Sequence, residues 1–263
     1  MPFTPSHVAA VLPFARTPLL PAGLVIGSMV PDLFYFVPVD IPREFSHSPL
    51  GAVTLDLGVG ALLFALWRWI FRRPVMDLAP LWVRGRFATA EIGLRGRTGE
   101  GGMPWAGFCL LLASSLLVGI ASHLLWDAAT HRGLITDVFP LLLSEAGPMR
   151  LTAWLQHGSS VLGTVVVLVW IGWWASHTPL GEPAPSRLTT AGRAIAVAGL
   201  VAVGLALGGY YWVAGIRTGL SPVDSTLVFR SVRLTIGAAG LFAALLSLIW
   251  WTLPGYSRAR SAA

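Results

Sequence analysis

Long apolar runs separated by short polar segments fill most of the chain. A helix needs about 20 mainly apolar residues to cross a bilayer, and five runs reach that length. They are Leu50–Phe71, Trp105–Ala129, Trp154–Ala175, Ala191–Val213 and Ser231–Leu253. Aromatic residues gather at the ends of the last three, as is typical of the headgroup layer. The pattern predicts an all-α, polytopic transmembrane helical bundle, forming a single integral membrane domain over residues 1–263.

A sixth apolar run, Leu19–Val37, is short and is interrupted by Pro31 and Asp32. Proline removes a helix hydrogen bond and disfavours helix in the residue before it. Irregular backbone at membrane depth is tolerated only where protein or water satisfies its polar groups. We therefore expect a broken or re-entrant N-terminal helix here, which leaves the number of spans at five or six.

Composition excludes an ordinary soluble domain. Hydrophobic residues make up 55% of the chain and charged residues 11%, whereas soluble domains carry about 25% charged residues. The net charge is +6 and all 18 basic residues are arginine. Because these arginines lie mostly between the apolar runs, we expect membrane lipids as partners and no nucleic acid.

The arginines also predict an orientation. Six of them fall in residues 72–104, which we interpret as an Arg-rich cytoplasmic loop. Alternation of the spans then places Thr130–Ala153 outside and the C-terminal tail, with Arg258 and Arg260, in the cytoplasm. The sequence therefore predicts a multi-pass protein of the cell membrane with a cytoplasmic C-terminus.

The sharpest local motif lies at the end of the second span. His123, Asp127 and His131 are spaced four residues apart, so on a helix their side chains form one stripe. Imidazole and carboxylate groups at this spacing can bind one metal ion or two adjacent ones. The alternative is a pair of histidines that cap the helix end or reach the interface. Three ionisable groups at the end of an apolar helix favour a site, because charge within a membrane is costly.

Further polar residues of the first 160 positions converge on the same face. His47 precedes the first span and His157 begins the third, so the parity of the spans brings both to the end that carries His131. Asp32 joins them from the broken helix, and His7 joins only if that helix does not fully cross. By the arginine distribution, this face is extracytoplasmic. The candidate metal ligands are His7, Asp32, His47, His123, Asp127 and His131.

Two neighbouring residues keep open roles. His157 could be a ligand, a general base or a donor to a ligand, and we name His157 and Asp127 as candidate catalytic residues. Asp56 lies inside the first span, where an uncompensated carboxylate is expensive. It could support the site or pair with Arg68.

These motifs together resemble the family of domains of unknown function numbered 4184. The resemblance rests on Met-Pro-Phe-Thr-Pro-Ser-His, Gly-Ser-Met-Val-Pro-Asp-Leu, Phe-Ser-His-Ser, Ser-His-x-x-x-Asp-x-x-x-His and Leu-Gln-His-x-Ser-Ser. Their order is also similar to inner-membrane metal-dependent hydrolases and, more distantly, to the zinc-dependent phospholipase C group. The resemblance implies a helical fold with His and Asp ligands for zinc or a related divalent ion. The phospholipase group uses an N-terminal Trp amine and a Glu for three metals; here the chain starts with Met-Pro, so one or two ions are expected.

Three functions fit the sequence. The first is a membrane-embedded metal-dependent hydrolase that attacks an ester or phosphoester of a lipid or lipid-linked substrate. The second is a non-catalytic membrane protein, either a divalent-ion transporter or a metal-stabilised scaffold. In the third, the polar residues only pair with one another.

Overall fold

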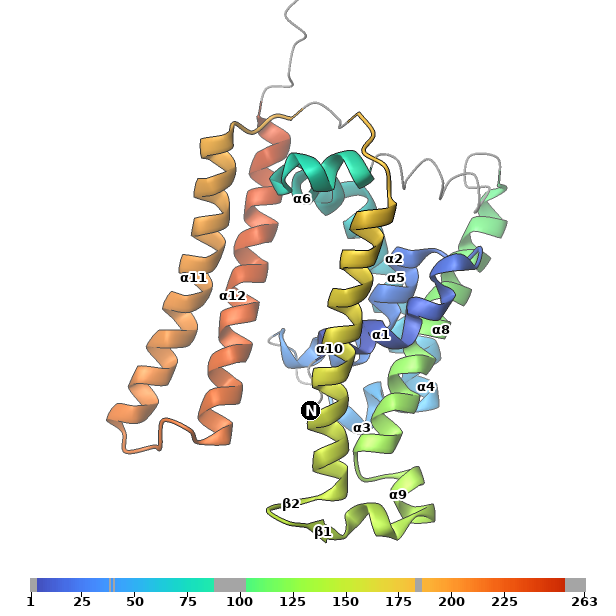
Figure 1. Ribbon diagram of the computed structural model, residues 1–263, viewed down its shortest axis with the longest axis vertical. Helices are drawn as coiled ribbons and strands as arrows, with labels where there is room; N and C mark the ends of the chain where they lie inside the picture. The colour runs from blue at the N-terminus through green and yellow to red at the C-terminus, as the bar shows by residue number, and fades with distance from the viewer. Residues whose placement is uncertain (1–3, 38, 40, 88–102, 183–185, 254–263) are drawn as a thin grey trace, which may run out of the picture. The chain divides into compact units, whose positions relative to one another are not determined.

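The computed structural model describes residues 4–37, 39, 41–87, 103–182 and 186–253, and these are almost entirely helical (Figure 1). Five helical runs are long and apolar enough to cross a membrane: Pro49–Leu78, Trp105–Val138, Leu151–His177, Thr190–Arg217 and Ser225–Thr252. Each contains one of the five predicted spans or overlaps most of it. The predicted all-α, polytopic helical fold is therefore confirmed.

The chain divides into two compact units. Unit 1 comprises Met1–Phe34, Val39–Ala65 and Ala90–Pro179, and unit 2 comprises Tyr35–Pro38, Leu66–Thr89 and Leu180–Ala263. The helices of unit 1 are η1 (Thr4–His7), α1 (Val8–Val11), η2 (Leu12–Arg16), α2 (Pro21–Gly27), η3 (Val30–Tyr35, which ends in unit 2), α3 (Arg43–Ser46), α4 (Pro49–Gly51), η4 (Ala52–Asp56), α5 (Leu57–Leu66), α8 (Trp105–Thr130), α9 (Leu134–Val138), η6 (Pro140–Leu143) and α10 (Leu151–His177). A short antiparallel hairpin, β1 (Glu145–Ala146) and β2 (Met149–Arg150), precedes α10.

The sixth apolar run is a broken helix, as the sequence predicts. The α-helix α2 stops at Gly27, and the 3-10 helix η3 begins at Val30, just before Pro31. The break leaves the carbonyl oxygen of Ser28 without a helical partner of its own, and it is turned toward α8, where it meets His123. The irregular backbone is thus satisfied by protein, as burial requires.

Glycines allow α2 and α8 to cross closely. A Cβ added to Gly27 would collide with the carbonyl oxygen of Leu116, and one added to Gly119 would collide with that of Leu24. His123 lies one helical turn beyond Gly119, so the same crossing carries its ring to the break after α2. The close approach of these two helices positions one wall of the site.

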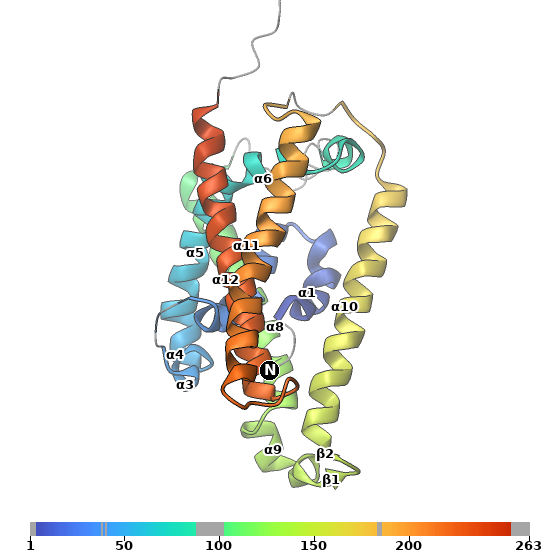
Figure 2. The ribbon, with the colours of Figure 1, turned by 90° about the vertical axis from the view of Figure 1, so that its left-hand side faces the viewer.

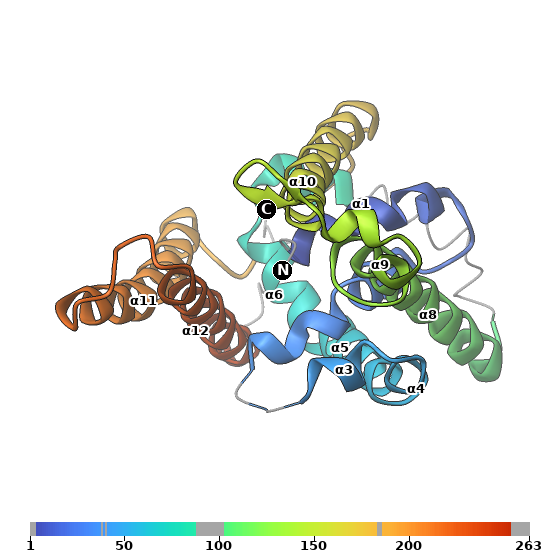
Figure 3. The same ribbon diagram turned by 90° about the horizontal axis from the view of Figure 1, so that it is seen from below.

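A second close approach folds α3 back against α4, beside α5 (Figure 3). A Cβ on Gly51 would collide with the carbonyl oxygen of Phe45. The hydroxyl of Ser48 accepts a hydrogen bond from the amide of Gly51 and caps α4. This tight turn sets His47, the C-cap of α3, at the start of the first span.

Unit 2 is built on a helical hairpin. It contains the π-helix η5 (Trp67–Phe71), α6 (Arg72–Leu78), a further helical stretch over 81–87, and the long helices α11 (Thr190–Arg217) and α12 (Ser225–Thr252). The last two run side by side (Figure 2). Gly204 and Gly208 of α11 lie against Thr235 of α12 and leave no room for a larger side chain.

The expected loop over 72–104 begins as helix. Helix α6 covers Arg72–Leu78 and lies across the end of α12 within unit 2 (Figure 1). Pro74 lacks the N–H that would bond to the carbonyl of Ile70 four residues earlier, and the indole of Trp251 donates to that carbonyl at 3.0 Å. Residues 88–102 of the predicted loop lie outside the described residues. The polar composition of this segment was therefore a poor guide to its local structure.

Candidate metal centre

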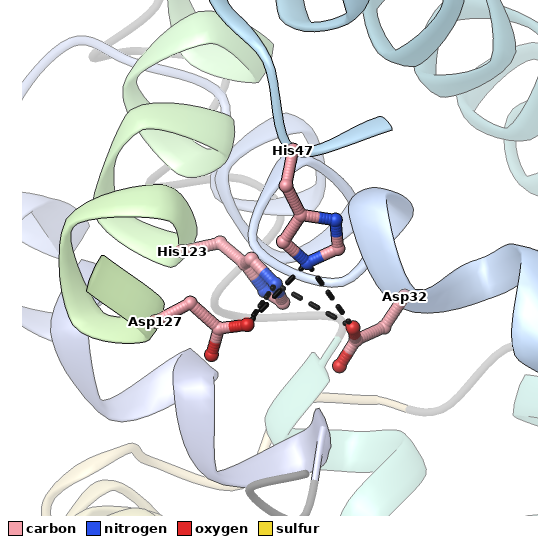
Figure 4. Close-up of side chains that lie close together, drawn as sticks. All are labelled: Asp32, His47, His123 and Asp127. Atoms are coloured by element: carbon pink, nitrogen blue, oxygen red, sulfur yellow. Dashed lines mark ion pairs between the residues drawn. The ribbon is translucent and has the colours of Figure 1, made fainter. Parts of the chain in front are cut away.

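Four side chains from three segments of unit 1 converge on one point (Figure 4). Asp32 comes from η3, His47 from the end of α3, and His123 and Asp127 from one face of α8. One ligand atom from each lies within 4.8 Å of the other three. Three of the four residues are buried and His47 is nearly so.

The spacing of these atoms is that of ligands around a common ion. The Nε2 atom of His47 lies 3.6 Å from Oδ1 of Asp32 and 3.4 Å from Oδ2 of Asp127. The Nε2 atom of His123 lies 3.7 and 3.9 Å from the same two oxygens. Tetrahedral bonds of about 2.0–2.1 Å to zinc separate neighbouring ligand atoms by about 3.3–3.4 Å. The four atoms are thus slightly further apart than a zinc site requires and too far apart for good hydrogen bonds.

Three of the four atoms that face the centre have no hydrogen bond in the part of the chain that the structure describes, and the fourth, Oδ2 of Asp127, accepts one from Arg43. Among the described residues, Oδ1 of Asp32 and the Nε2 atoms of His47 and His123 are buried without a hydrogen bond. Oδ1 of Asp127 and both ring nitrogens of His7 share this state. An unpaired polar atom in a buried position costs about 1–3 kcal/mol. Several such atoms lie close together here, and the four-residue cluster they belong to could hold a metal ion.

The opposite edges of the ligands are fixed by hydrogen bonds. The Nδ1 atom of His123 lies 2.9 Å from the carbonyl oxygen of Ser28, so it must be the protonated nitrogen. Ser46 holds Nδ1 of His47 at 2.9 Å and donates its own hydrogen to the carbonyl of Arg43. The neutral ring of His123 therefore presents an unprotonated Nε2 to the centre, and the contact with Ser46 fixes the orientation of the His47 ring. Such orienting contacts accompany most metal-binding histidines.

The carboxylates are oriented in the same way. The hydroxyl of Thr4 donates to Oδ2 of Asp32 at 2.8 Å, which leaves Oδ1 facing the centre. The guanidinium of Arg43 donates to Oδ2 of Asp127 at 2.7 Å. Oδ1 of Asp127 is turned to Nε2 of His7, 3.6 Å away. Asp127 therefore faces His7 through Oδ1 and the other histidines of the cluster through Oδ2.

His7 packs directly on the cluster. Its ring stacks on His123 with a centroid distance of 4.1 Å and is fully buried. Burial, and then the nearby His123, lower the pKa of His7 to about 4. The ring is therefore neutral at physiological pH, as a metal ligand must be.

Electrostatics favour a positive charge between the carboxylates. Burial by itself would lower the pKa of His47, but the adjacent Asp127 and Asp32 turn the net shift upward. The two carboxylates thus draw a proton toward the centre. A divalent cation would satisfy the same demand with more charge.

Of the eight residues that the sequence singled out, the structure gathers six. His7, Asp32, His47, His123 and Asp127 form the body of the cluster, and His131 lies at its edge. The expected stripe of three along one helix is only partly formed, because α8 ends at Thr130 and His131 already has extended backbone. Its Nδ1 atom still lies 3.6 Å from Oδ2 of Asp127.

The other two residues stand apart. His157 is exposed on α10, while neighbouring positions of that helix face unit 1: Ser159 accepts a hydrogen bond from Trp126, and Gly163 lies against Ser6. Its catalytic role stays a prediction without geometric support. Asp56 is fully buried, and neither of its oxygens has a hydrogen-bond partner among the described residues. The role of Asp56 stays a prediction.

The sequence interpretation missed the residues that hold the ligands in place. Thr4, Ser28, Arg43 and Ser46 were not predicted to take part. Thr4, Ser28 and Ser46 lie within motifs that were recognised, and Arg43 lies two residues before Phe-Ser-His-Ser. Hydroxyl and carbonyl groups beside candidate ligands were the available signal.

Comparison with known proteins settles the family. The family model described as Domain of unknown function (DUF4184) matches residues 1–249. The chain belongs to this family. No curated protein and no solved structure matches the chain. The DUF4184 match spans every ligand of the cluster and nearly the whole membrane-like helical body, and the family description assigns no activity.

Proposed function

We propose that this DUF4184 protein is a membrane-embedded, metal-dependent hydrolase acting on an ester or phosphoester of a lipid or lipid-linked substrate. One observation carries the proposal. Four mutually facing ligand atoms of Asp32, His47, His123 and Asp127 are buried together. Hydrogen bonds hold the other edge of Asp32 and of the two histidines, and Arg43 donates to the facing oxygen of Asp127.

The donor set fits zinc or a related divalent ion. Two imidazole nitrogens and two carboxylate oxygens match the ligands and the number that zinc takes. His7 and His131 lie beside Asp127 and could complete a larger shell or hold a second ion. The ion would act as a Lewis acid and make water a stronger nucleophile.

The residues of the chain would supply the rest of the chemistry. In hydrolysis, the oxygen of water bonds to the carbonyl carbon or phosphorus while the bond to the alcohol oxygen breaks. One proton of the water must then reach the departing alcohol. His7, neutral and adjacent to Asp127, is placed to accept and return it. Asp127 serves as a ligand in this scheme, and Arg43 donates a hydrogen bond to it.

The position of the cluster supports a lipid substrate. His47 lies two residues before the helical run Pro49–Leu78, and Asp127 lies in the last turn of α8. These positions correspond to headgroup depth when the long helices span a bilayer. The reactive ester of a membrane lipid lies at the same depth. We propose that this face is the extracytoplasmic one and that the C-terminus is cytoplasmic, on the arginine distribution.

Metal content and hydrolysis of the purified chain test the proposal. His123→Asn removes the inward nitrogen, while its amide can still donate to the carbonyl of Ser28. We expect it to lose at least about 100-fold in zinc affinity, because removing even a group that only orients a ligand costs 10–100-fold. Lipid hydrolysis should fall with the bound zinc.

The matched control is His177→Ala, since His177 is an exposed histidine outside the cluster. It should retain both zinc and activity. Hydrolysis by protein stripped of metal, or wild-type zinc affinity in His123→Asn, would refute the proposal.

A divalent-ion transporter is the second candidate, favoured by the broken helix. Asp32 lies in η3, next to the interruption after α2, and transport sites commonly use such interrupted helices. The placement of the cluster at helix ends counts against it, because transport sites lie near the bilayer midplane. Zinc flux into proteoliposomes that Asp127→Asn abolishes would favour transport over hydrolysis.

A further inference from the structure

One arginine stands at the edge of the cluster. Arg43 is the first residue of α3, and its guanidinium donates to Oδ2 of Asp127 at 2.7 Å. Its side chain is 32% exposed, while that of Asp127 is 6% exposed. Arg43 therefore connects a buried ligand to the surface beside the centre.

Most of the donors of Arg43 remain available. A guanidinium carries five N–H groups in a planar fork, and one of them has a partner within the described part of the chain. The fork is anchored on the same oxygen that belongs to the four-residue cluster. Its remaining donors therefore lie beside any group that an ion at the centre would bind. This fork matches the oxygens of phosphate groups.

The charges at the centre select a class of substrate. With neutral histidines, Asp32, Asp127 and Arg43 sum to one negative charge, and a divalent ion changes that to one positive charge. A phosphodiester carries a single negative charge and would make the site neutral. A carboxylic ester carries none and would leave the site with its net positive charge.

The surroundings of Arg43 are lipid-like. Phe45 and Leu50, close by in sequence, are large apolar side chains with 39% and 62% exposure. Helix α3 immediately precedes the run Pro49–Leu78, so it lies at the level of lipid phosphates when that helix spans a bilayer. An arginine at this depth meets phosphodiester groups as its commonest anionic neighbours.

We propose that the site takes phosphodiesters of membrane lipids, with Arg43 gripping the phosphoryl oxygens while the ion contacts another oxygen of the same group. The inference rests on the proposed metal centre and narrows its substrate from esters in general to anionic phosphodiesters. Arg43 is then a substrate-binding residue.

Binding to the zinc-loaded chain in micelles tests this inference. Three probes separate the alternatives: a short-chain phosphatidylglycerol, the chain-free phosphodiester dimethyl phosphate, and a neutral diacylglycerol. We expect Arg43→Gln to weaken phosphatidylglycerol binding roughly 10- to 100-fold, as the loss of charge-assisted hydrogen bonds implies. The phosphatidylglycerol affinity of Arg43→Lys should lie between those of wild type and Arg43→Gln, because lysine keeps the charge and lacks the planar fork of donors. Diacylglycerol binding should change in neither variant.

The control is Arg16→Gln, which removes the same charge from an exposed arginine of unit 1 that lies over Trp173. It should bind all probes like wild type. Zinc content is measured in every variant at saturating zinc, so that failure of the metal centre can be told apart from failure of the role of Arg43. If the wild-type chain binds no zinc, the proposed metal centre itself is wrong. Bound zinc with phosphatidylglycerol affinity unchanged in Arg43→Gln, or an equal loss for diacylglycerol, overturns the role of Arg43. If dimethyl phosphate binds as tightly as phosphatidylglycerol, the proposal that the bound phosphodiester belongs to a lipid is wrong.

Discussion

Each unit contains a polar cluster built around buried aspartate, and the carboxylates of the two clusters differ in how they are paired. In unit 2, Asp77 of α6 is almost completely enclosed, and donors surround both of its oxygens. Oδ2 accepts from the amide of Arg187 at 2.9 Å, the amide of Leu188 at 3.2 Å and the indole of Trp250 at 2.8 Å. Oδ1 accepts from the hydroxyl of Ser186.

The charge of Asp77 is also compensated. Arg84 and Arg193 approach Oδ1 at 3.9 and 3.7 Å, and Arg193 donates to the Asp77 carbonyl at 2.7 Å. The carboxylate thus joins α6 to the segment before α11 and to the end of α12. Burying a charged carboxylate costs desolvation free energy, and the attraction to these partners offsets that cost.

In unit 1, by contrast, Asp32 and Asp127 each present one oxygen without a hydrogen-bond partner in the described chain. Four histidines surround them, and Arg43 is the only described arginine that pairs with either. A carboxylate cluster that needed only internal pairing could have been satisfied as Asp77 is. The two clusters therefore differ in pairing: donors surround the carboxylate of Asp77, whereas among the described residues Asp32 and Asp127 keep unpaired oxygens close to buried histidine nitrogens.

Breaking the satisfied cluster should have the largest effect on stability. We expect Asp77→Asn to lower the free energy of unfolding by about 3–5 kcal/mol, because it removes the negative charge beside Arg84 and Arg193 and replaces one acceptor oxygen by a donor group among buried donors. Zinc content should stay unchanged. Thermal melting in detergent, with zinc-free buffer, measures the first quantity, and elemental analysis of zinc-loaded protein measures the second.

The comparison variant is Asp32→Asn in the same zinc-free buffer. Its Oδ1 has no hydrogen bond to lose, so we expect a smaller drop in melting temperature than for Asp77→Asn. The contrast between the clusters fails if Asp32→Asn destabilises the metal-free chain as much, or if Asp77→Asn empties the metal centre.

The sequence predicts the helical fold well because lipid imposes a simple rule. Runs such as Trp105–Ala129 have no way to bury their apolar surface except in a membrane, and their length follows from bilayer thickness. The break near Pro31 was predictable for a similar reason, since proline chemistry is local. These features depend on neighbours in sequence alone.

The details of the site depend on neighbours in space, which the sequence does not state. That Gly27 meets Leu116 and that Gly119 meets Leu24 decides how close α2 comes to α8. No local pattern distinguishes these glycines from Gly58, whose Cβ would meet open space. The number of spans between the histidines predicts that they lie at one end of the bundle, but it does not predict the hydrogen bond from Thr4 to Asp32. The role of Asp77 was missed because the hydrogen-bond donors to its carboxylate lie more than 100 residues away.

Substituting a group that orients a ligand should have a smaller effect, and this effect should appear in zinc affinity. Thr4→Val keeps the shape of the side chain and removes the hydrogen bond to Oδ2 of Asp32. We expect zinc affinity to fall 10- to 100-fold, as for other groups that hold a ligand in place. Competition with a chelator of known affinity measures the change.

Thr17→Val is the matched control, since the hydroxyl of Thr17 bonds to the carbonyl of Phe14 in its own turn, away from the cluster. Its zinc affinity should equal that of wild type. Equal affinities for Thr4→Val and wild type would show that Asp32 needs no such support, and would weaken the case that its free oxygen is aimed at an ion.

The smallest effect is expected at His157, where the sequence predicted a catalytic role. A helix turns about 100° per residue, so Ser159 and Gly163 lie about 40° apart on the face of α10 that contacts Trp126 and Ser6. His157 lies about 200° from Ser159 on the same helix and is directed away from that face. We expect His157→Ala to change zinc affinity and hydrolysis less than about twofold, within the range of ordinary surface substitutions. Parallel kinetic and zinc-binding assays check this. A large loss of hydrolysis with zinc retained would restore His157 as a catalytic residue and require α10 to rotate when substrate binds.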